Sequence, residues 1–406
     1  MSNLALNLTI KGDFIDSFIY SGILYLLDTD FNFKSYRWED ICNYIKNRNG
    51  FKSGYDKRIF NYFIDNNIRD FLPNVIDTEI NETELLNLKR DEIHIKYWPS
   101  DISLFANRLY YSGDDGVYYI NTNHRDALFK KERKKNKIFG VKSFSISPET
   151  YQRVALGAGN EGVFTSCFYS TPNNPTEKKI SNSSCIDVEW INNFLFINAD
   201  RFFINKFKNI LNKSEINSEE KYKKIRHDII EKFGSGMDSD NTISLNTYKK
   251  YVIEAFGEPP EKLDLASRFR YGWSSGDVDY FLTNDNSIAA HNKITGTVKY
   301  SRMSNRVDDV LKVRTSGCGT VVETLKGCLF LLTEDGCEKI SDEHVSWRVY
   351  PRARHHSNHL HIVNEDNINI RVYGVNESES FLRSYLSKKN SDDYLYSTQE
   401  MINKKQ

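Results

Sequence analysis

The sequence predicts an all-β fold made of about seven repeated units, interrupted by two helical insertions. A short pattern of apolar residues followed by Asp or Asn recurs along the chain. Apolar residues make up 39% and aromatic residues 13% of the 406 residues, too many for a disordered chain. No apolar run reaches the about 18 residues of a membrane helix. The chain is therefore expected to build a large core from many short strands.

Each copy of the pattern has an apolar run, a polar residue, any residue, and then Asp or Asn. These carboxylates and amides are Asp30, Asp114, Asn160, Asp200, Asp285, Asp335 and Asp366. The apolar runs have the aromatic and β-branched composition of strands. The polar residues and glycines that follow are typical of turns. Each copy therefore predicts a β-hairpin with a turn at the Asp or Asn.

The spacing of these hairpins predicts the architecture. Successive copies are 84, 46, 40, 85, 50 and 31 residues apart. A period of about 40 to 50 residues is typical of one four-stranded blade of a β-propeller. We expect a single propeller of about seven blades over 1–386, or six blades with one irregular hairpin, and a polar tail over 387–406. The short last gap indicates a trimmed blade, or a last blade completed by an N-terminal strand over 4–10.

Two gaps are too long by about one blade, and both contain helical sequence. The first insertion spans about 38–72, and its apolar residues have helical spacing from Ile59 to Phe71. The second spans about 205–263. There we expect one helix capped by Ser218, and another over 247–256. A further short helix is expected over 379–386.

This organisation resembles the β-propeller superfamily over most of the chain. The Trp-Asp dipeptide of WD40 blades and the paired glycines of kelch blades are absent. The segment from Ser112 to Tyr119, SGDDGVYY, resembles the Asp box of sialidase-like propellers. In that family the box is a structural turn, so the resemblance implies a hairpin and not glycosidase activity.

A glycine pattern at 157–162, GAGNEG, fits the G-x-G-x-x-G spacing of dinucleotide-binding loops. That function requires a helix that begins at the third glycine and holds the pyrophosphate. The sequence after Gly162 is β-prone instead and then contains two prolines. It also aligns with the other hairpins. We therefore expect a hairpin and predict no cofactor.

A histidine-rich segment, RARHHSNHLHIV, is the first candidate binding site. Its candidate residues are Arg352, Arg354, His355, His356 and His359. The arginines favour contact with an anion or phosphate. His359 and His361 would share one face of a strand, as in metal sites, but no third ligand is evident. An exposed loop that leads into a strand is the simpler interpretation, so no metal is predicted.

The second candidate is the basic run KKERKKNK at 130–137. Its candidate residues are Lys130, Lys131, Arg133, Lys134 and Lys135. Dense positive charge binds nucleic-acid phosphates by releasing counterions. No aromatic residues alternate with the lysines to stack on bases. A solvated loop between two blades is therefore the favoured interpretation.

No catalytic constellation can be assigned from the sequence. There is no G-x-S-x-G elbow, and no Cys-x-x-Cys motif for zinc or redox chemistry. The segment 316–319, SGCG, is interpreted as a turn before a strand rather than a reactive cysteine. The repeated Asp and Asn residues are interpreted as turn formers, because catalysis at one point does not require seven copies.

Three functions remain open from the sequence. The leading hypothesis is a protein-interaction scaffold or adaptor subunit of a larger complex, with partner surfaces on the helical insertions. The first alternative is a hydrolase or lyase with its site at the mouth of the propeller channel. The second is a nucleic-acid-binding adaptor, which the zero net charge of the chain disfavours. The absence of a catalytic motif favours a protein without enzymatic activity.

The expected compartment is the cytoplasm. The first residues, MSNLALNLTIKGDF, have neither a basic segment nor a long apolar segment of the secretory type. The six cysteines are scattered and form no disulfide framework. No association with a membrane is expected.

Overall fold

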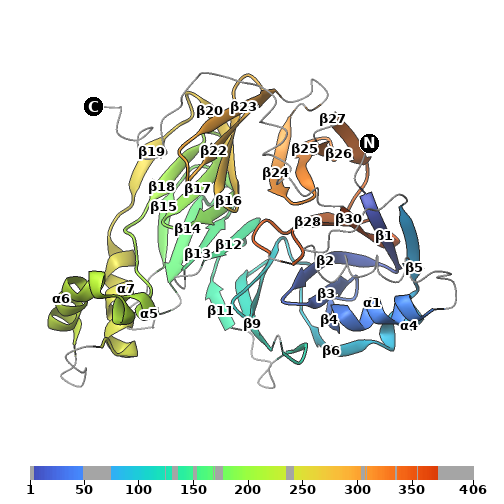
Figure 1. Ribbon diagram of the computed structural model, residues 1–406, viewed down its shortest axis with the longest axis horizontal. Coiled ribbons are helices and arrows are strands. Elements are labelled where there is room, and N and C mark those ends of the chain that lie inside the picture. Colours follow the sequence, from blue (N-terminus) through green and yellow to red (C-terminus); the bar gives the residue numbers. More distant parts are fainter. Residues whose placement is uncertain are drawn as a thin grey trace. The chain divides into compact units, whose positions relative to one another are not determined.

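The computed structural model confirms the predicted all-β fold. It describes residues 4–48, 75–123, 125–129, 136–149, 153–167, 169, 177–234, 242–302, 307, 309–333, 336–353 and 355–373. These residues form seven sheets of four or five strands, each built mainly from consecutive antiparallel strands (Figure 1). This is the arrangement of a seven-bladed β-propeller, so seven blades replace the alternative of six. We number the blades 1 to 7 along the chain.

The chain divides into two compact units, which we describe separately. The first unit comprises 1–98, 120–135 and 273–406, and the second comprises 99–119 and 136–272. Strands β9 and β20 cross the division. The prediction of a single domain over 1–386 stays a prediction. The expected helix at 379–386 and the tail at 387–406 lie outside the described residues.

The first unit contains blades 5, 6, 7 and 1. Blade 1 consists of β2 (Phe14–Tyr20), β3 (Ile23–Asp28), β4 (Asn32–Arg37) and β6 (Lys89–His94). Blade 5 consists of β20 (Phe269–Ser275), β21 (Val278–Thr283), β22 (Ser287–Asn292) and β23 (Val298–Arg302). Blade 6 consists of β24 (Val310–Ser316), β25 (Gly319–Thr324), β26 (Leu329–Thr333) and β27 (Gly336–Ser341). Blade 7 consists of β28 (Ser346–Val349), β29 (His359–Val363), β30 (Asn367–Tyr373), β1 (Leu4–Lys11) and β5 (Ile76–Ile80).

The second unit contains blades 3 and 4 and most of blade 2. Blade 2 consists of β7 (Ile102–Phe105), β8 (Arg108–Gly113) and β9 (Gly116–Asn123), and β9 pairs with both β10 (Leu128–Phe129) and β11 (Asn136–Phe139). Blade 3 consists of β12 (Ser145–Glu149), β13 (Arg153–Gly157), β14 (Val163–Cys167) and β15 (Lys178–Ser181). Blade 4 consists of β16 (Cys185–Ile191), β17 (Phe194–Ala199), β18 (Phe203–Lys206) and β19 (Glu261–Asp264).

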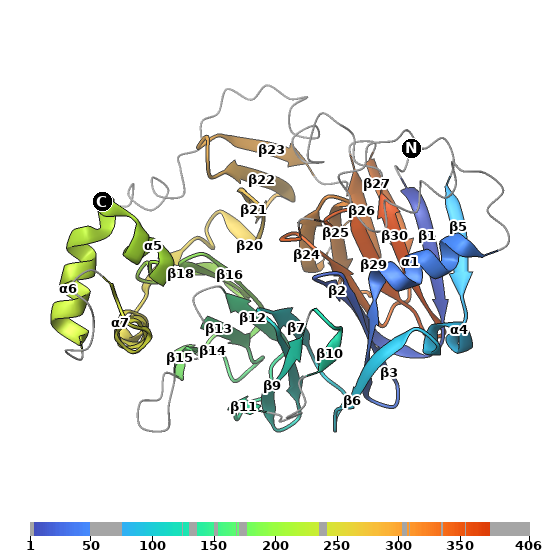
Figure 2. The same ribbon diagram turned by 60° about the horizontal axis from the view of Figure 1, so that its bottom comes forward.

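The closing blade, blade 7, takes strands from both ends of the chain. β1 pairs antiparallel with β30, with Leu8 opposite Ile370, which confirms the predicted closure by the N-terminal strand. The sequence did not reveal that β5 adds a fifth, parallel strand on the other side of β1 (Figure 2). Pairing on both sides protects β1 from joining a second chain.

The first insertion lies between β4 and β6. Helix α1 (Trp38–Asn47) buries Trp38, Ile41 and Ile45 in the same core as the apolar residues of β1. Helix α4 (Glu82–Leu86) begins with a capping box formed by Asn81 and Glu84. The predicted helical stretch from Ile59 to Phe71 lies outside the described residues.

The second insertion is helical as predicted and lies between β18 and β19. It contains α5 (Lys213–Ser218), the 3-10 helix η1 (Glu220–Tyr222), α6 (Lys223–Phe233) and α7 (Leu245–Gly257). The predicted capping role of Ser218 is wrong. Ser218 is the last residue of α5, because the extended backbone of Glu219 ends the helix there. The side chain of Ser244 instead caps α7, accepting a hydrogen bond from Thr247 N.

The repeated Asp or Asn lies in a hairpin turn in each described copy. In six blades it falls between the second and third strands, as at Asp285 between β21 and β22. The copy that ends at Asp335 is an exception, since its apolar run lies in β26, the third strand of blade 6, while Asp335 itself lies outside the described residues. The corresponding turn of that blade contains Gly327, with a φ of +76°. The last gap is therefore short because the sixth copy was assigned one hairpin too late, not because a blade is trimmed.

Candidate functional site

The structure describes only part of the two candidate sites. All the candidate residues of the basic run, 130–135, lie outside the described residues, and so does Arg354. Arg352 and His355 are exposed between β28 and β29, where an anion could reach them. His356 and His359 are 7% and 0% exposed, so these two imidazoles face the interior.

Three histidine rings gather inside the first unit. The ring centroids of His356 and His359 are 4.9 Å apart, and those of His359 and His361 are 6.2 Å apart. His359 and His361 therefore share one face of β29, as the sequence predicts. Trp38 packs edge-on against His359 at 5.9 Å, and Tyr350 packs against His361 at 5.1 Å. Within the described ranges, no group of three or more His, Cys, Asp or Glu side chains is arranged to hold a metal ion.

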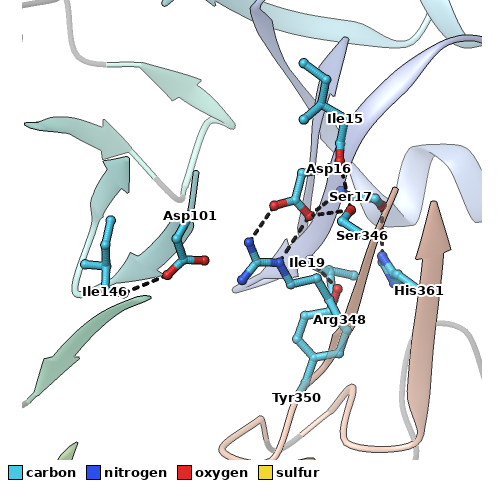
Figure 3. Close-up of polar contacts among 10 residues, drawn as sticks. All are labelled: Ile15, Asp16, Ser17, Ile19, Asp101, Ile146, Ser346, Arg348, Tyr350 and His361. Carbon is cyan, nitrogen blue, oxygen red and sulfur yellow. Dashed lines mark hydrogen bonds and ion pairs between the residues drawn. The ribbon is translucent and has the colours of Figure 1, made fainter. Parts of the chain in front are cut away.

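The contact between Ser17 and His361 resembles the nucleophile and base of a hydrolase. Ser17 Oγ lies 2.9 Å from His361 Nδ1, the separation of a nucleophile and its base (Figure 3). Both side chains are 0% exposed, so no substrate can approach them as they stand. Burial, together with the nearby His356, lowers the pKa of His361 to about 3, far below that of an effective base at neutral pH. The arrangement fits a neutral hydrogen bond between β2 and β29.

Further polar side chains join β28 to β2 beside this pair (Figure 3). Arg348 Nε donates to Asp16 Oδ1 over 3.1 Å, and its Nη2 approaches Asp16 Oδ2 at 2.5 Å. Ser346 Oγ donates to the carbonyl of Ile15 over 2.8 Å. Tyr350 Oη accepts a hydrogen bond from Ile19 N over 3.1 Å. The first strands of neighbouring blades, here β28 and β2, belong to different sheets and are not paired by backbone hydrogen bonds. These side-chain contacts join them instead.

The same arrangement recurs in the second unit. Val188 N donates to Ser145 Oγ over 3.2 Å, and Trp190 N donates to Ser147 Oγ over 2.8 Å, so β12 is joined to β16. Ile146 N likewise donates to the carboxylate of Asp101 over 2.7 Å (Figure 3). The polar side chains on first strands thus have a common structural role.

Sequence reasoning missed Asp16, Ser17, Arg348 and Tyr350. The sequence does contain a signal for part of this set. Ser346, Arg348 and Tyr350 occupy every second position, so in an extended segment they share one face. No signal indicated Asp16 as their partner, since the two segments are far apart in the chain.

The glycine pattern at 157–162 forms the predicted hairpin. It joins β13 to β14, and no helix follows the third glycine. Gly162 has a φ of +94°, and a Cβ placed there would lie 2.1 Å from the carbonyl oxygen of Ser181. The glycine is therefore required by the close approach of the residues at the end of β15. A nucleotide-binding loop is not formed.

The segment around Cys318 forms the predicted turn, between β24 and β25. Burial raises the pKa of the Cys318 thiol to about 12, so the reactive thiolate is scarce at neutral pH. This cysteine packs in the core of blades 6 and 7.

Comparison with known proteins identifies no family for this chain. No protein-family profile and no curated protein match the chain. Among solved structures, it is similar to a chain of a mitotic checkpoint complex, with 10% identity, a TM-score of 0.43, and coverage of 92% of this chain and 90% of the other. It is also similar to BBS1N, solved in complex with ARL6DN, with 7% identity, a TM-score of 0.43, and coverage of 93% and 98%. A third is the Neurospora crassa Pan2 WD40 domain, with 7% identity, a TM-score of 0.41, and coverage of 92% and 96%. Similarities this weak carry no functional argument, and the fold assignment rests on the seven sheets themselves.

Proposed function

We propose that this β-propeller is a protein-interaction scaffold or adaptor subunit of a larger cytoplasmic complex. The observation that carries the proposal is the helical insertion of blade 4. β18 and β19 pair in register on either side of it, from Phe203 opposite Asp264 to Lys206 opposite Glu261, so the helices are additional to a complete blade. Extra elements on a rigid scaffold are well suited to partner recognition.

The insertion presents apolar side chains to solvent. Ile225 on α6 is 38% exposed, and Leu245 at the start of α7 is 52% exposed. Lys224 and Glu231 on α6 are also exposed, which makes the surface mixed. Exposed apolar residues among polar ones are typical of surfaces that bind other proteins. The leading hypothesis from the sequence requires such a surface on an insertion helix.

The two alternatives have weaker support. An enzyme needs accessible polar groups, whereas Ser17 and His361 are buried and bonded to each other. A nucleic-acid adaptor would depend on the basic run at 130–137 and on Arg352 and His355, and it stays a prediction. Among the described residues, no helix is long and apolar enough to cross a membrane. The cytoplasmic location is proposed from the free thiols of all six cysteines.

The test is capture of partners by the tagged protein from the cells that produce it. Extracts are treated with nuclease and washed at about 0.3 M salt, which screens weak surface charges. We expect a stoichiometric protein partner, retained about tenfold less by the double variant Ile225→Lys with Leu245→Lys. Ile294→Lys is the matched control, because Ile294 is 73% exposed on blade 5, in the turn between β22 and β23. A protein that retains no partner, or retains it equally in both variants, would contradict the proposal.

A further inference from the structure

One edge of the first unit is a continuous line of loops. In an antiparallel four-stranded sheet, the turn between strands two and three and the connection to the next sheet lie at the same end. Backbone contacts join these loops within blades 6 and 7. Leu325 N donates to the carbonyl of Asp309 over 2.8 Å, and Val345 N donates to that of Val363 over 2.8 Å. His344 Nε2 lies 3.2 Å from Glu323 Oε1 near the end of β25, which connects blade 6 to the loop before blade 7.

The line continues from blade 7 into blade 1. Gly12 N donates to the carbonyl of Asp366 over 3.0 Å, and Thr29 N donates to that of Asp13 over 3.3 Å. Ile95 N then donates to the carbonyl of Phe31 over 2.8 Å. We call this edge the rim, defined by the described residues of 309, 325–326, 342–345, 364–366, 12–13, 29–31 and 95–98.

Large apolar side chains are exposed near both ends of the rim. At one end Leu325 is 67% exposed and Val345 is 43% exposed. At the other end Trp98 is 54% exposed and stands edge-on to Phe31, with ring centroids 6.3 Å apart. Exposed apolar patches bordered by polar residues are a feature of surfaces that bind partners.

The rim also carries an excess of negative charge. Six of its acidic residues are exposed and, within the described part of the chain, make no ion pair: Asp13, Asp30, Asp309, Glu343, Glu365 and Asp366. The exposed cations of the rim are Lys96 and Lys326, and Lys96 lies over the ring of Tyr97. Because the whole chain has a net charge of zero, this excess is local.

We propose that the rim binds a protein segment with a basic centre and apolar side chains toward both ends. The acids of 343, 365–366 and 13 lie between the apolar residues of the two ends, so a complementary segment would bring lysine or arginine to the centre. Opposite charge would steer its approach, and the apolar ends would hold it. Negative charge also disfavours nucleic acid and anionic lipid as occupants. This inference rests on the proposed scaffold function and assigns it a second surface, separate from the helical insertion.

The test measures binding of a fluorescein-labelled peptide with a lysine-rich centre and Leu-Trp at both ends, by fluorescence anisotropy. Two matched peptides carry glutamate in place of lysine, or serine in place of Leu and Trp. We expect the lysine peptide to bind at least about tenfold more tightly than either, and more weakly as salt rises. Leu325→Ser with Val345→Ser should weaken its binding about tenfold. Glu365→Lys with Asp366→Lys should weaken it similarly and favour the glutamate peptide.

Matched controls lie on blade 5, at the end of its sheet opposite to the turn between its second and third strands. Ile294→Ser removes a more exposed apolar side chain, and Asp277→Lys reverses an exposed charge, both away from the rim. Neither should change binding by more than about twofold. Equal binding of the lysine and glutamate peptides, or equal losses in rim and control variants, would overturn the proposal. Binding only after the lysines and arginine of 130–135 are changed to glutamine would do the same, because the protein's own basic run would then be the occupant.

Failure of the rim proposal can be distinguished from failure of the scaffold proposal. If the peptide fails to bind while the insertion variants still lose a captured partner, the rim proposal falls and the scaffold function stands. If neither experiment detects binding, both fall.

Discussion

At the scale of the residue, polar side chains in the interior of this protein connect strands that belong to different blades. Ser17 with His361, and Asp16 with Arg348, each join blade 7 to blade 1. A buried polar group without a partner costs about 1–3 kcal/mol, so each pair stabilises one register of the two strands. Such buried pairs also make the stability of the fold depend on the protonation of their side chains.

The buried position of His361 predicts how the free energy of unfolding depends on pH. Its pKa falls from 6.5 to about 3 in the folded protein, because burial and then the neighbouring His356 and Arg348 disfavour the charged ring. The unfolded chain therefore binds the proton more readily than the folded one. The stabilisation is complete above pH 6.5 and is lost as the pH falls toward 3, by up to about 1.4 kcal/mol per pH unit.

Urea unfolding between about pH 7.5 and about pH 5 checks this prediction above the range where carboxylates titrate. His361→Gln should reduce the slope of unfolding free energy against pH. Burial also lowers the pKa of His291, so part of the slope should remain. The exposed His355→Gln is the control, since it removes an imidazole outside the core. A slope unaltered in His361→Gln would show that this ring does not titrate as described.

Gly162 gives a second prediction at this scale. Gly162→Ala should lower the free energy of unfolding by about 3 kcal/mol or more, because its Cβ would overlap the Ser181 carbonyl. Gly276→Ala is the matched control, since Gly276 also has a positive φ, +55°, but no atom within 4 Å of the added Cβ. It should lose only about 1 kcal/mol. Similar losses in urea unfolding would mean that backbone strain, and not the close approach, requires Gly162.

The histidine segment shows where sequence reasoning reaches its limit. Alternation placed His359 and His361 on one face of a strand, and this was confirmed. The segment also contains many polar residues, which is typical of exposed loops, yet Asn358 is 0% exposed and donates to the carbonyl of Tyr373 over 2.8 Å. That bond holds the segment against the core, and no local pattern specifies a partner on another strand.

At the scale of the element, the hairpin was predictable and its position within the blade was not. The apolar run and its Asp specify a strand and a turn locally, as at Asp285, which accepts from the Thr283 hydroxyl in the turn after β21. Whether the turn joins strands two and three or strands three and four depends on pairing with neighbours. β5 was missed for the same reason. Its sequence, IDTEI, is not a clear strand pattern by itself, and the strand is defined by its pairing with β1.

Helix α7 allows a prediction about the insertion. Its buried Phe256 stacks on Phe207, the residue that follows β18, with ring centroids 5.8 Å apart, and both belong to the same core as Trp190 of blade 4. Leu245 on the same helix is 52% exposed. Phe256→Ala should lower the free energy of unfolding by about 3–5 kcal/mol, and Leu245→Ala by less than about 0.5 kcal/mol. Urea unfolding of the two variants measures the difference. Equal effects would contradict a shared core of helix and blade.

At the scale of the whole molecule, blade 7 is completed by segments from outside its own stretch of chain. β1 leads directly into β2, and β5 comes from the insertion between β4 and β6, so two segments adjoining blade 1 complete the sheet of blade 7. The sequence predicted the first of these segments from the short last gap. That gap arose from a misplaced sixth copy, so the prediction was right although its basis was not.

Removal of residues 1–11 tests this closure. The deletion exposes the edge of β30 and removes Leu6, Leu8 and Ile10, each at most 1% exposed. Burial of three such side chains contributes about 6 kcal/mol or more, so the melting temperature should fall by at least about 7 °C. The open edge should also cause self-association, detected by light scattering.

A synthetic peptide of residues 1–11, added to the shortened protein, should restore much of the lost melting temperature by pairing as a strand between β30 and β5. The same peptide with serine at 6, 8 and 10 retains the backbone donors and acceptors but lacks the buried side chains. It should not restore stability, because the alternating apolar residues fix the register in which β1 meets Ile370. Rescue by both peptides would mean that backbone pairing alone closes the blade, and rescue by neither would mean that closure requires the covalent link from β1 to β2.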